Sequence, residues 1–238
     1  MSYNKSIVIL TGAGISQESG LKTFRDSDGF WENNEIEKIA NYKSFEENPS
    51  LVNEFYNERR KQLFDLNIVP NDAHFALADF EKKWNGDFLL VTQNVDNLHE
   101  RAGSNKLIHL HGELLKARCY KISCKNNSRI IDWDGPISNN IFCEKCNSTY
   151  EIRPHVVWFG EQPLDLEKIY SSLKACEIFI SIGTSGTVFP AADFINQVNT
   201  NCKTIEINIS ETKISKYFKE NYFGTAASKV PEILKSLI

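Results

Sequence analysis

The sequence predicts an α/β protein built on a doubly wound parallel sheet. Short apolar runs alternate along the chain with amphipathic stretches, as strands alternate with helices in such a fold. The runs are too short for buried helices and consist mostly of Ile, Val, Leu and Phe, which favours strands covered on both faces. The predicted strands are SIVILT (6–11), FLLVTQ (88–93), KLIHLH (106–111), EIFISIG (177–183) and TIEIN (204–208).

Two of the intervening stretches have the periodicity of amphipathic helices. Residues 71–84 place an apolar stripe on one face, and Pro49 favours the first turn of a second helix over residues 49–66. The stripe of the first helix comprises Ala73, Leu77, Phe80 and Trp84. The stripe of the second, within about 120° on a helical wheel, comprises Leu51, Val52, Phe55, Leu63 and Leu66.

The composition is that of an ordinary globular protein. Its 238 residues suffice for one large domain or for a domain with a small insert. A net charge of −4 argues against a broadly basic surface for nucleic acid or membrane, and no apolar run reaches membrane-spanning length. Six cysteines without a secretion signal favour a reducing compartment. We therefore expect a cytoplasmic protein whose clustered thiols bind a metal or serve catalysis.

Small, polar and ionisable residues follow the predicted strands. The segments after the strands read TGAGIS, TQNVDN, HGE, GTSG and NIS. Parallel strands have their carboxyl ends at one edge of the sheet, and open α/β sheets bind ligands outside that edge. The order of the segments therefore predicts one shared site.

The first of these segments has the features of a phosphate-binding loop. Gly12, Gly14 and Ser16 can bring backbone amides and a hydroxyl to a pyrophosphate at the start of a following helix. A tight turn between strand and helix would leave the same pattern. A hydride-transferring dehydrogenase is disfavoured, because Gln17 replaces the third glycine of the dinucleotide fingerprint and no strand ending in an acidic residue follows roughly 20 residues later.

A wider set of motifs resembles one protein family. GAGIS, TFR, TQNVDNLHERAG, HGE, RPHVVWFGE and GTS occur in this order in the sirtuins, which are NAD-dependent protein lysine deacylases. The resemblance runs nearly end to end. It implies a Rossmann-like NAD-binding domain (1–35, 70–117 and 154–238), a helical part of a small domain (36–69) and a zinc-binding insert (118–153).

The resemblance implies that NAD is a consumed co-substrate. In sirtuins the acyl-lysine oxygen attacks C1′ of the nicotinamide ribose, and a histidine then acts as general base on a ribose hydroxyl. The products are deacylated lysine, nicotinamide and 2′-O-acyl-ADP-ribose. His111 of HGE matches the base, and imidazole has an ordinary pKa near the operating pH. His109 shares a face of the same predicted strand, whereas His74 and His99 are interpreted as core or surface residues.

The resemblance also implies the contacts of cofactor and substrate. Acylated lysine side chains of proteins are the implied partners, and we expect a monomer. The segment VVWFG (156–160), predicted as a strand, would pair with the substrate backbone. Substrate contacts would come from Val157, Phe159, Gly160 and Glu161. NAD contacts would come from Gly12, Ala13, Gly14, Ser16, Phe24, Arg25, Gln93, Asn94, Asp96, Gly183, Thr184, Ser185, Asn208 and Ala226.

One arginine lies on the apolar face of the second predicted helix. Arg59 falls near the middle of the stripe, with Tyr56 at its edge one turn away. A guanidinium there is costly unless an anion meets it, although it could also reach solvent or an internal carboxylate. Y-x-x-R and TFR resemble the sirtuin subclass that removes succinyl or malonyl groups, in which Tyr and Arg bind the acyl carboxylate. The resemblance implies this preference here, with residual deacetylase activity.

Four cysteines frame the polar insert. Cys119 and Cys124 form a C-x₄-C pair, and Cys143 and Cys146 form a regular C-x₂-C pair. Two such pairs favour one closed structural zinc over free thiols, although most zinc-bearing sirtuins have C-x₂-C in both. Cys176 and Cys202 are interpreted as core residues.

Other functions stay open at this point. An NAD glycohydrolase or an ADP-ribosyltransferase would use the same cofactor, and a catalytically silent NAD-binding module would need only the cofactor loops. RPHVVWFGE favours deacylation over the first two, and His111 argues against the third.

Overall fold

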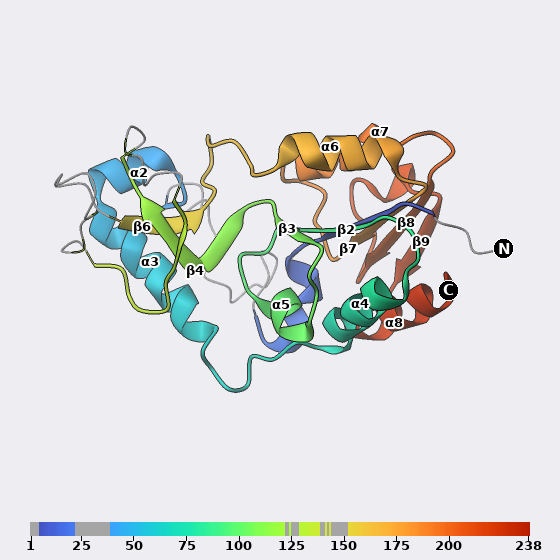
Figure 1. Ribbon diagram of the computed structural model, residues 1–238, viewed down its shortest axis with the longest axis horizontal. Helices are drawn as coiled ribbons and strands as arrows, with labels where there is room; N and C mark the ends of the chain where they lie inside the picture. The colour runs from blue at the N-terminus through green and yellow to red at the C-terminus, as the bar shows by residue number, and fades with distance from the viewer. Residues whose placement is uncertain are drawn as a thin grey trace.

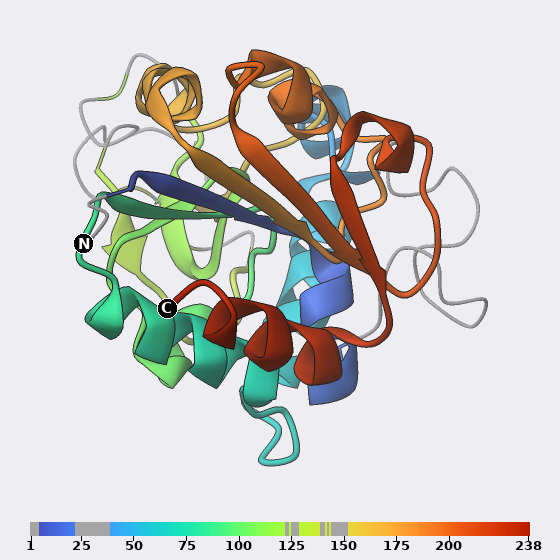
Figure 2. The same cartoon turned by 90° about the vertical axis from the view of Figure 1, so that its right-hand side faces the viewer.

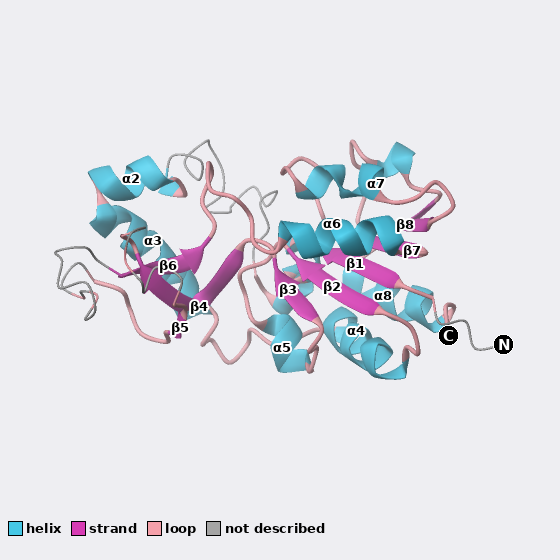
Figure 3. Cartoon of the chain, turned by 45° about the horizontal axis from the view of Figure 1, so that its top comes forward, coloured by secondary structure: helices cyan, strands magenta, loops and turns pink. Residues whose placement is uncertain are grey.

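The protein has two lobes that lie side by side along its long axis (Figure 1). The structure, a computed structural model, describes residues 5–21, 39–121, 124, 129–138, 141, 143 and 152–238. The larger lobe carries a six-stranded sheet and the smaller a three-stranded sheet, and the two sheets stand apart (Figure 3). No helix in the described part of the chain is long and apolar enough to cross a membrane.

The large sheet is parallel and has the strand order β3-β2-β1-β7-β8-β9. Numbered along the chain within this sheet, the order is that of the Rossmann fold, which confirms the predicted fold class. The order reverses between β1 and β7, so a ligand crevice is expected beyond their carboxyl ends. The strands are β1 (Ile7–Thr11), β2 (Phe88–Thr92), β3 (Leu107–His109), β7 (Ile178–Ile182), β8 (Lys203–Asn208) and β9 (Glu220–Phe223).

Helices cover both faces of this sheet. In Figure 2, α4 (Asp72–Lys83) and α8 (Ala226–Lys235) lie below the strands, with α6 (Leu166–Ala175) and α7 (Phe194–Gln197) above. Alternate residues of β1 pack into opposite cores: Ile9 joins the α4–α8 side, and Leu10 joins the α6–α7 side. Complete burial of one such side chain stabilises the fold by about 1.5–3 kcal/mol. This two-sided burial explains the continuous apolar runs.

The small lobe combines two helices with an antiparallel sheet. The helices are α2 (Tyr42–Glu47) and α3 (Pro49–Gln62), and the Asn48 side chain accepts from the Leu51 backbone N–H at 3.1 Å to cap α3. In the sheet, β4 (Gly112–Cys119) pairs with β5 (Ile131–Asp132) and β6 (Ile152–Val156). The core of this lobe includes Phe45, Val52, Phe55, Leu114 and Trp158.

The structure corrects several predicted bounds. Of the segment 156–160, predicted as a strand, only Val156 lies in one, because β6 ends at that residue. Beyond it, Phe159 makes an isolated bridge to Asn41. The helix predicted over 49–66 ends at Gln62, so Leu66 lies outside it and is 92% exposed. Leu51, predicted on the buried stripe, is 48% exposed, because the stripe that packs on the sheet is narrower than the predicted arc.

Four further differences concern loops, a domain boundary and a sheet edge. The first glycine loop runs into the 3₁₀ turns Ala13–Ile15 and Gln17–Ser19 rather than directly into an α-helix. His111 lies in the turn after β3 and not on that strand with His109. The boundary predicted at 117 falls inside β4, which belongs entirely to the small sheet. Edge strand β9 was missed because its alternating, half-exposed residues do not form an apolar run.

Candidate active-site cleft

A cleft of about 510 Å³ opens between the two lobes at the reversal point of the large sheet. Residues from both lobes line it, which agrees with the prediction that the segments after the strands share one site. From the large lobe, the predicted residues on its wall are Gly12, Ala13, Gly14, Gln93, Asn94, His111, Gly183, Thr184, Ser185 and Asn208. From the small lobe and its connection, they are Tyr56, Arg59, Val157, Phe159, Gly160 and Glu161.

Two glycines allow the loops after β1 and β7 to meet at the floor of the cleft. The Gly14 N–H donates to the Gly183 carbonyl at 2.9 Å. A Cβ added to Gly14 would lie 2.8 Å from the Gly183 Cα, and Gly183 has a φ of +61°, a region that favours glycine. Because side chains are absent here, backbone groups form the floor, as phosphate binding requires.

We expect Gly14→Ala to lower the free energy of unfolding by on the order of 2 kcal/mol, because backbone atoms, and not a flexible side chain, must move. For a chain of this size that corresponds to a fall in Tm of about 4–8 °C in thermal unfolding. Gly135→Ala is the matched control, because nothing lies within 4 Å of its added Cβ. Equal Tm values for the two variants would contradict the tight-contact explanation.

A buried polar network supports the floor from behind. Asn94 Nδ2 donates to the Gly12 carbonyl at 3.3 Å and to Ser16 Oγ at 3.1 Å, and the Ser16 hydroxyl donates to Asp96 at 3.1 Å. Burial raises the pKa of Asp96, while hydrogen bonds from Leu98 and Ser16 act in the opposite direction. Ser16 and Asp96, predicted to contact the cofactor, are both buried, and neither is among the described residues that line the cleft.

A backbone hydrogen bond determines which nitrogen of His111 carries the proton. Its Nδ1 lies 3.1 Å from the Gln93 carbonyl, which can only accept, so Nδ1 carries the proton and Nε2 is left as the basic nitrogen. Burial lowers the pKa of His111, which keeps the ring neutral at neutral pH. In contrast, His74 and His99 are core residues whose rings pack edge to face, in agreement with their interpretation from the sequence.

Tyr56 and Arg59 bring a hydroxyl and a guanidinium into the small-lobe side of the cleft. Arg59 is 8% exposed, donates from Nη1 to the Phe55 carbonyl at 2.8 Å, and places its guanidinium carbon 3.3 Å from the Phe55 ring centroid. Burial lowers the pKa of Arg59 to about 10, so the group stays cationic at neutral pH. Burial raises the pKa of Tyr56, whose hydroxyl therefore keeps its proton and can donate it.

The segment after β6 is held by an ion pair that sequence reasoning missed. Glu161 accepts from Arg153 at 2.6 and 2.9 Å and from the Trp158 backbone N–H at 2.8 Å. The Arg153 guanidinium also stacks 3.2 Å above the Trp158 ring. The Glu161 carboxylate thus shapes the cleft wall around Trp158. The only sequence signal was an arginine inside the apolar run IRPHVVWF.

Other predicted residues lie elsewhere. Ala226 starts α8, is buried, and is absent from the described cleft wall. Phe24, Arg25 and Cys146 lie outside the described residues. Conversely, the cleft has lining residues that were not predicted, namely Gln17, Ala40, Val95, Trp158, Pro163, Thr187, Val188, Phe189 and Ile209.

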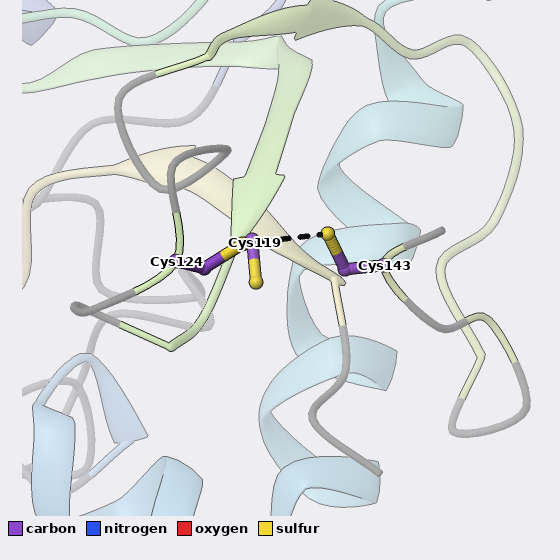
Figure 4. Close-up of side chains that lie close together, drawn as sticks. All are labelled: Cys119, Cys124 and Cys143. Carbon is purple, nitrogen blue, oxygen red and sulfur yellow. Dashed lines mark hydrogen bonds between the residues drawn. The ribbon is translucent and has the colours of Figure 1, made fainter. Parts of the chain in front are cut away.

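Three of the four predicted zinc ligands lie together at the end of β4. The sulfur atoms of Cys119, Cys124 and Cys143 are buried and all within 4.8 Å of one another (Figure 4). Cys124 and Cys143 have their Sγ atoms 3.8 Å apart, which is too far for a disulfide bond. Zinc–sulfur bonds of about 2.3 Å in a tetrahedron also place sulfurs about 3.8 Å apart, so these residues fit a structural zinc.

We expect purified protein to contain about one zinc ion per chain by elemental analysis, because a bound metal ion stabilises the deprotonated form of three convergent thiols. Chelation should lower Tm, since the ion would tie β4 to the insert. Cys176→Ser serves as the control, because this buried thiol lies away from the cluster and should leave zinc content unchanged. Zinc content well below one per chain would contradict the assignment.

Fold and cleft together define a nucleotide-binding α/β protein in which a second lobe faces the nucleotide site. The Sir2 family profile matches residues 12–190, and the chain belongs to this family, the sirtuins.

Relatives and solved structures extend this result over the whole chain. The chain is 51% identical over 239 residues to an NAD-dependent protein deacylase of Pasteurella multocida, with all of both chains covered. It is 48% identical to one of Vibrio vulnificus, covering 98% of this chain and 94% of that protein.

Among solved structures, a Sir2 homologue in complex with NAD matches with a TM-score of 0.86 and 36% identity, covering 99% of this chain and 90% of the other. A Sir2 protein bound to an acetylated peptide matches with a TM-score of 0.78 and 27% identity, covering 97% of this chain and 92% of the other.

Proposed function

We propose that this chain is an NAD-dependent protein lysine deacylase that prefers acidic acyl groups such as succinyl and malonyl. Its relatives at about half identity act as NAD-dependent protein deacylases by name, and they match from end to end. The preference for an acid is carried by one observation: Tyr56 and Arg59 line the cleft side by side from a buried helix face. The proposal includes a cytoplasmic monomer that acts on acylated proteins, without nucleic acid or membrane.

The proposed NAD orientation follows from the groups on each wall. The pyrophosphate would lie against the backbone of Gly12 to Gly14, where Gly183 keeps the floor free of side chains. The adenosine would extend toward Thr184 and Asn208, and the nicotinamide ribose toward Asn94 and His111. NAD supplies an electrophilic ribose carbon and nicotinamide as the leaving group. The chain's own residues bind and orient the two substrates.

His111 is assigned the proton-transfer step. Its neutral ring would accept the proton of a ribose hydroxyl at Nε2, while Nδ1 stays bonded to the Gln93 carbonyl. That bond fixes the tautomer, so Nε2 is the nitrogen that would accept the proton in each turnover.

We expect kcat/KM to fall on the acid side with an apparent pKa below the ordinary value of about 6.5, because burial favours the neutral base. His111→Ala should lower kcat by about 10²–10⁴-fold. ADP-ribose affinity, measured by calorimetry, should change much less, which separates lost catalysis from a lost site. A variant with near-normal turnover would overturn the assignment.

The acyl pocket lies on the small-lobe side. A guanidinium presents parallel N–H groups to a carboxylate, and a neutral phenol adds one donor, so Arg59 and Tyr56 match a terminal carboxyl group. An acetyl group lacks that carboxylate and would make no such bonds. The Arg59 charge would therefore discriminate between acyl groups, while His111 would serve all of them.

We expect Arg59→Met to lower kcat/KM on a succinyl-lysine peptide by about 10–100-fold, the value of one charge-assisted contact. The same variant should change acetyl-lysine turnover by less than about threefold. Lys61→Met is the matched control, since it removes one positive charge from the exposed side of the same helix. Equal losses on both peptides would contradict the acidic-acyl preference.

A panel of acetyl-, succinyl-, malonyl- and glutaryl-lysine peptides with NAD tests the activity itself. NAD consumption that depends on the peptide supports deacylation. NAD loss at the same rate without peptide would favour a glycohydrolase, and ADP-ribose joined to protein would favour a transferase. Tight NAD binding without nicotinamide release would favour a silent binding module.

A further inference from the structure

A second histidine holds the backbone of the turn between β2 and α5 (Leu98–Ala102), which carries the groups assigned to NAD. His109 Nδ1 lies 3.1 Å from the Asn94 carbonyl, and its Nε2 lies 2.7 Å from Glu100 Oε1. We propose that His109, as an imidazolium between Glu100 and the Asn94 carbonyl, is a positioning residue that fixes residues 93–96 for NAD. The choice of NAD as the ligand rests on the proposed function.

The two partners of His109 determine its protonation. A backbone carbonyl and an ionised carboxylate can only accept hydrogen bonds, so both ring nitrogens must donate. Only the imidazolium has a proton on each nitrogen. The side chain of His109 is 9% exposed, whereas that of Glu100 is 40% exposed, so water competes for the carboxylate more than for the ring.

The charges around His109 favour its cationic form. Glu100 faces it from α5 at hydrogen-bond distance, and Glu113 faces it from β4 at 4.0 Å, partly neutralised by Lys116 at 2.9 Å. Burial opposes ionisation, but the bond and charge of Glu100 raise the pKa of His109 above its ordinary value. The positive charge of His109 also acts on two buried neighbours. It favours the ionised form of the Asp96 carboxyl group and disfavours protonation of the His99 ring.

The contact of His109 leads directly to the cleft. Asn94 lines the cleft, and its side chain ties the turn to Gly12 and Ser16. His111 binds the Gln93 carbonyl at 3.1 Å, so two histidines one residue apart hold two successive carbonyls. If His109 loses its proton, one of its two bonds must be lost, and the backbone of Asn94 gains freedom that ligand binding then has to remove.

The pH dependence has a definite sign. The folded-state pKa of His109 is raised, so its contribution is fully present below the ordinary pKa of about 6.5 and is lost as pH rises through the folded value. Affinity of the cleft for ADP-ribose should therefore decrease with rising pH across that range. The effect of His111 on kcat/KM lies on the acid side, whereas the effect of His109 on affinity lies at higher pH, so the two histidines act at different ends of the pH range.

The test uses Glu100→Gln, an exposed change that keeps the side-chain size but removes the charge. The imidazole signals of His109 are titrated by NMR, and ADP-ribose binding is followed by calorimetry from about pH 6 to about pH 9. In the wild type, the binding transition should coincide with the NMR pKa of His109. In Glu100→Gln both should move to lower pH together, and affinity near neutral pH should fall by about tenfold.

Glu113→Gln is the matched control, since this carboxylate lies farther from the ring and already pairs with Lys116; it should leave ADP-ribose affinity within about twofold of the wild type. A lowered His109 pKa with unchanged ADP-ribose affinity would overturn the positioning role and leave a surface ion pair. Because ADP-ribose binding needs no acylated peptide, failure of the deacylase assay and failure of this inference are separate results.

Discussion

The backbone contact between Gly14 and Gly183 is the constraint on which the rest of the site depends. It joins the loops after β1 and β7 at the point where the sheet order reverses. From there, contacts pass outward through backbone groups: Gly12 receives the Asn94 side chain, and the Gln93 carbonyl receives His111. A side chain at the central contact would separate these loops, and His111 would lose its fixed distance from the floor of the cleft.

Two arginines buried beside the cleft have different surroundings. Arg153 has the Glu161 carboxylate at 2.6 Å, so its charge is neutralised inside the protein and its stacking on Trp158 shapes a wall. Arg59 stacks on Phe55 and borders the cleft itself. The desolvation of the Arg153 guanidinium is thus offset by a carboxylate of the protein itself, whereas the π face of Phe55 and the Phe55 carbonyl contact the Arg59 guanidinium.

The sequence was sufficient for elements whose residues are buried on both faces. The five strands predicted from the apolar runs of the large sheet occur within two residues of their predicted bounds, because continuous apolar runs leave few alternatives in an α/β protein. It was insufficient where an apolar run does not belong to a sheet: Val157 to Gly160 resembles a strand, yet its backbone N–H groups bind separate partners in His111, Glu161 and Ala40 rather than one neighbouring strand. Pairings such as Arg153 with Glu161 require the fold to be known first.

The same limit applies to the groups at the site. Spacing brought Gly12, Gly14, Asn94 and His111 to one edge, because strand ends in a parallel sheet share an edge. It did not give the hydrogen bonds that join these residues to their neighbours, such as those by which Ser16 accepts from Asn94 and donates to Asp96. Which side of a turn a small polar residue faces depends on backbone torsions that a motif does not record.

The tripeptide HLH (109–111) shows how the fold assigns different chemistry to identical side chains. Burial lowers the pKa of His111, whereas the Glu100 carboxylate raises that of His109. Each ring donates through Nδ1 to a carbonyl of the same turn, so Gln93 and Asn94 are fixed relative to both. His111 and the turn that follows β2 therefore keep a common position, and the charge state of each ring follows from its surroundings: burial in the case of His111, and a carboxylate beside Nε2 in the case of His109.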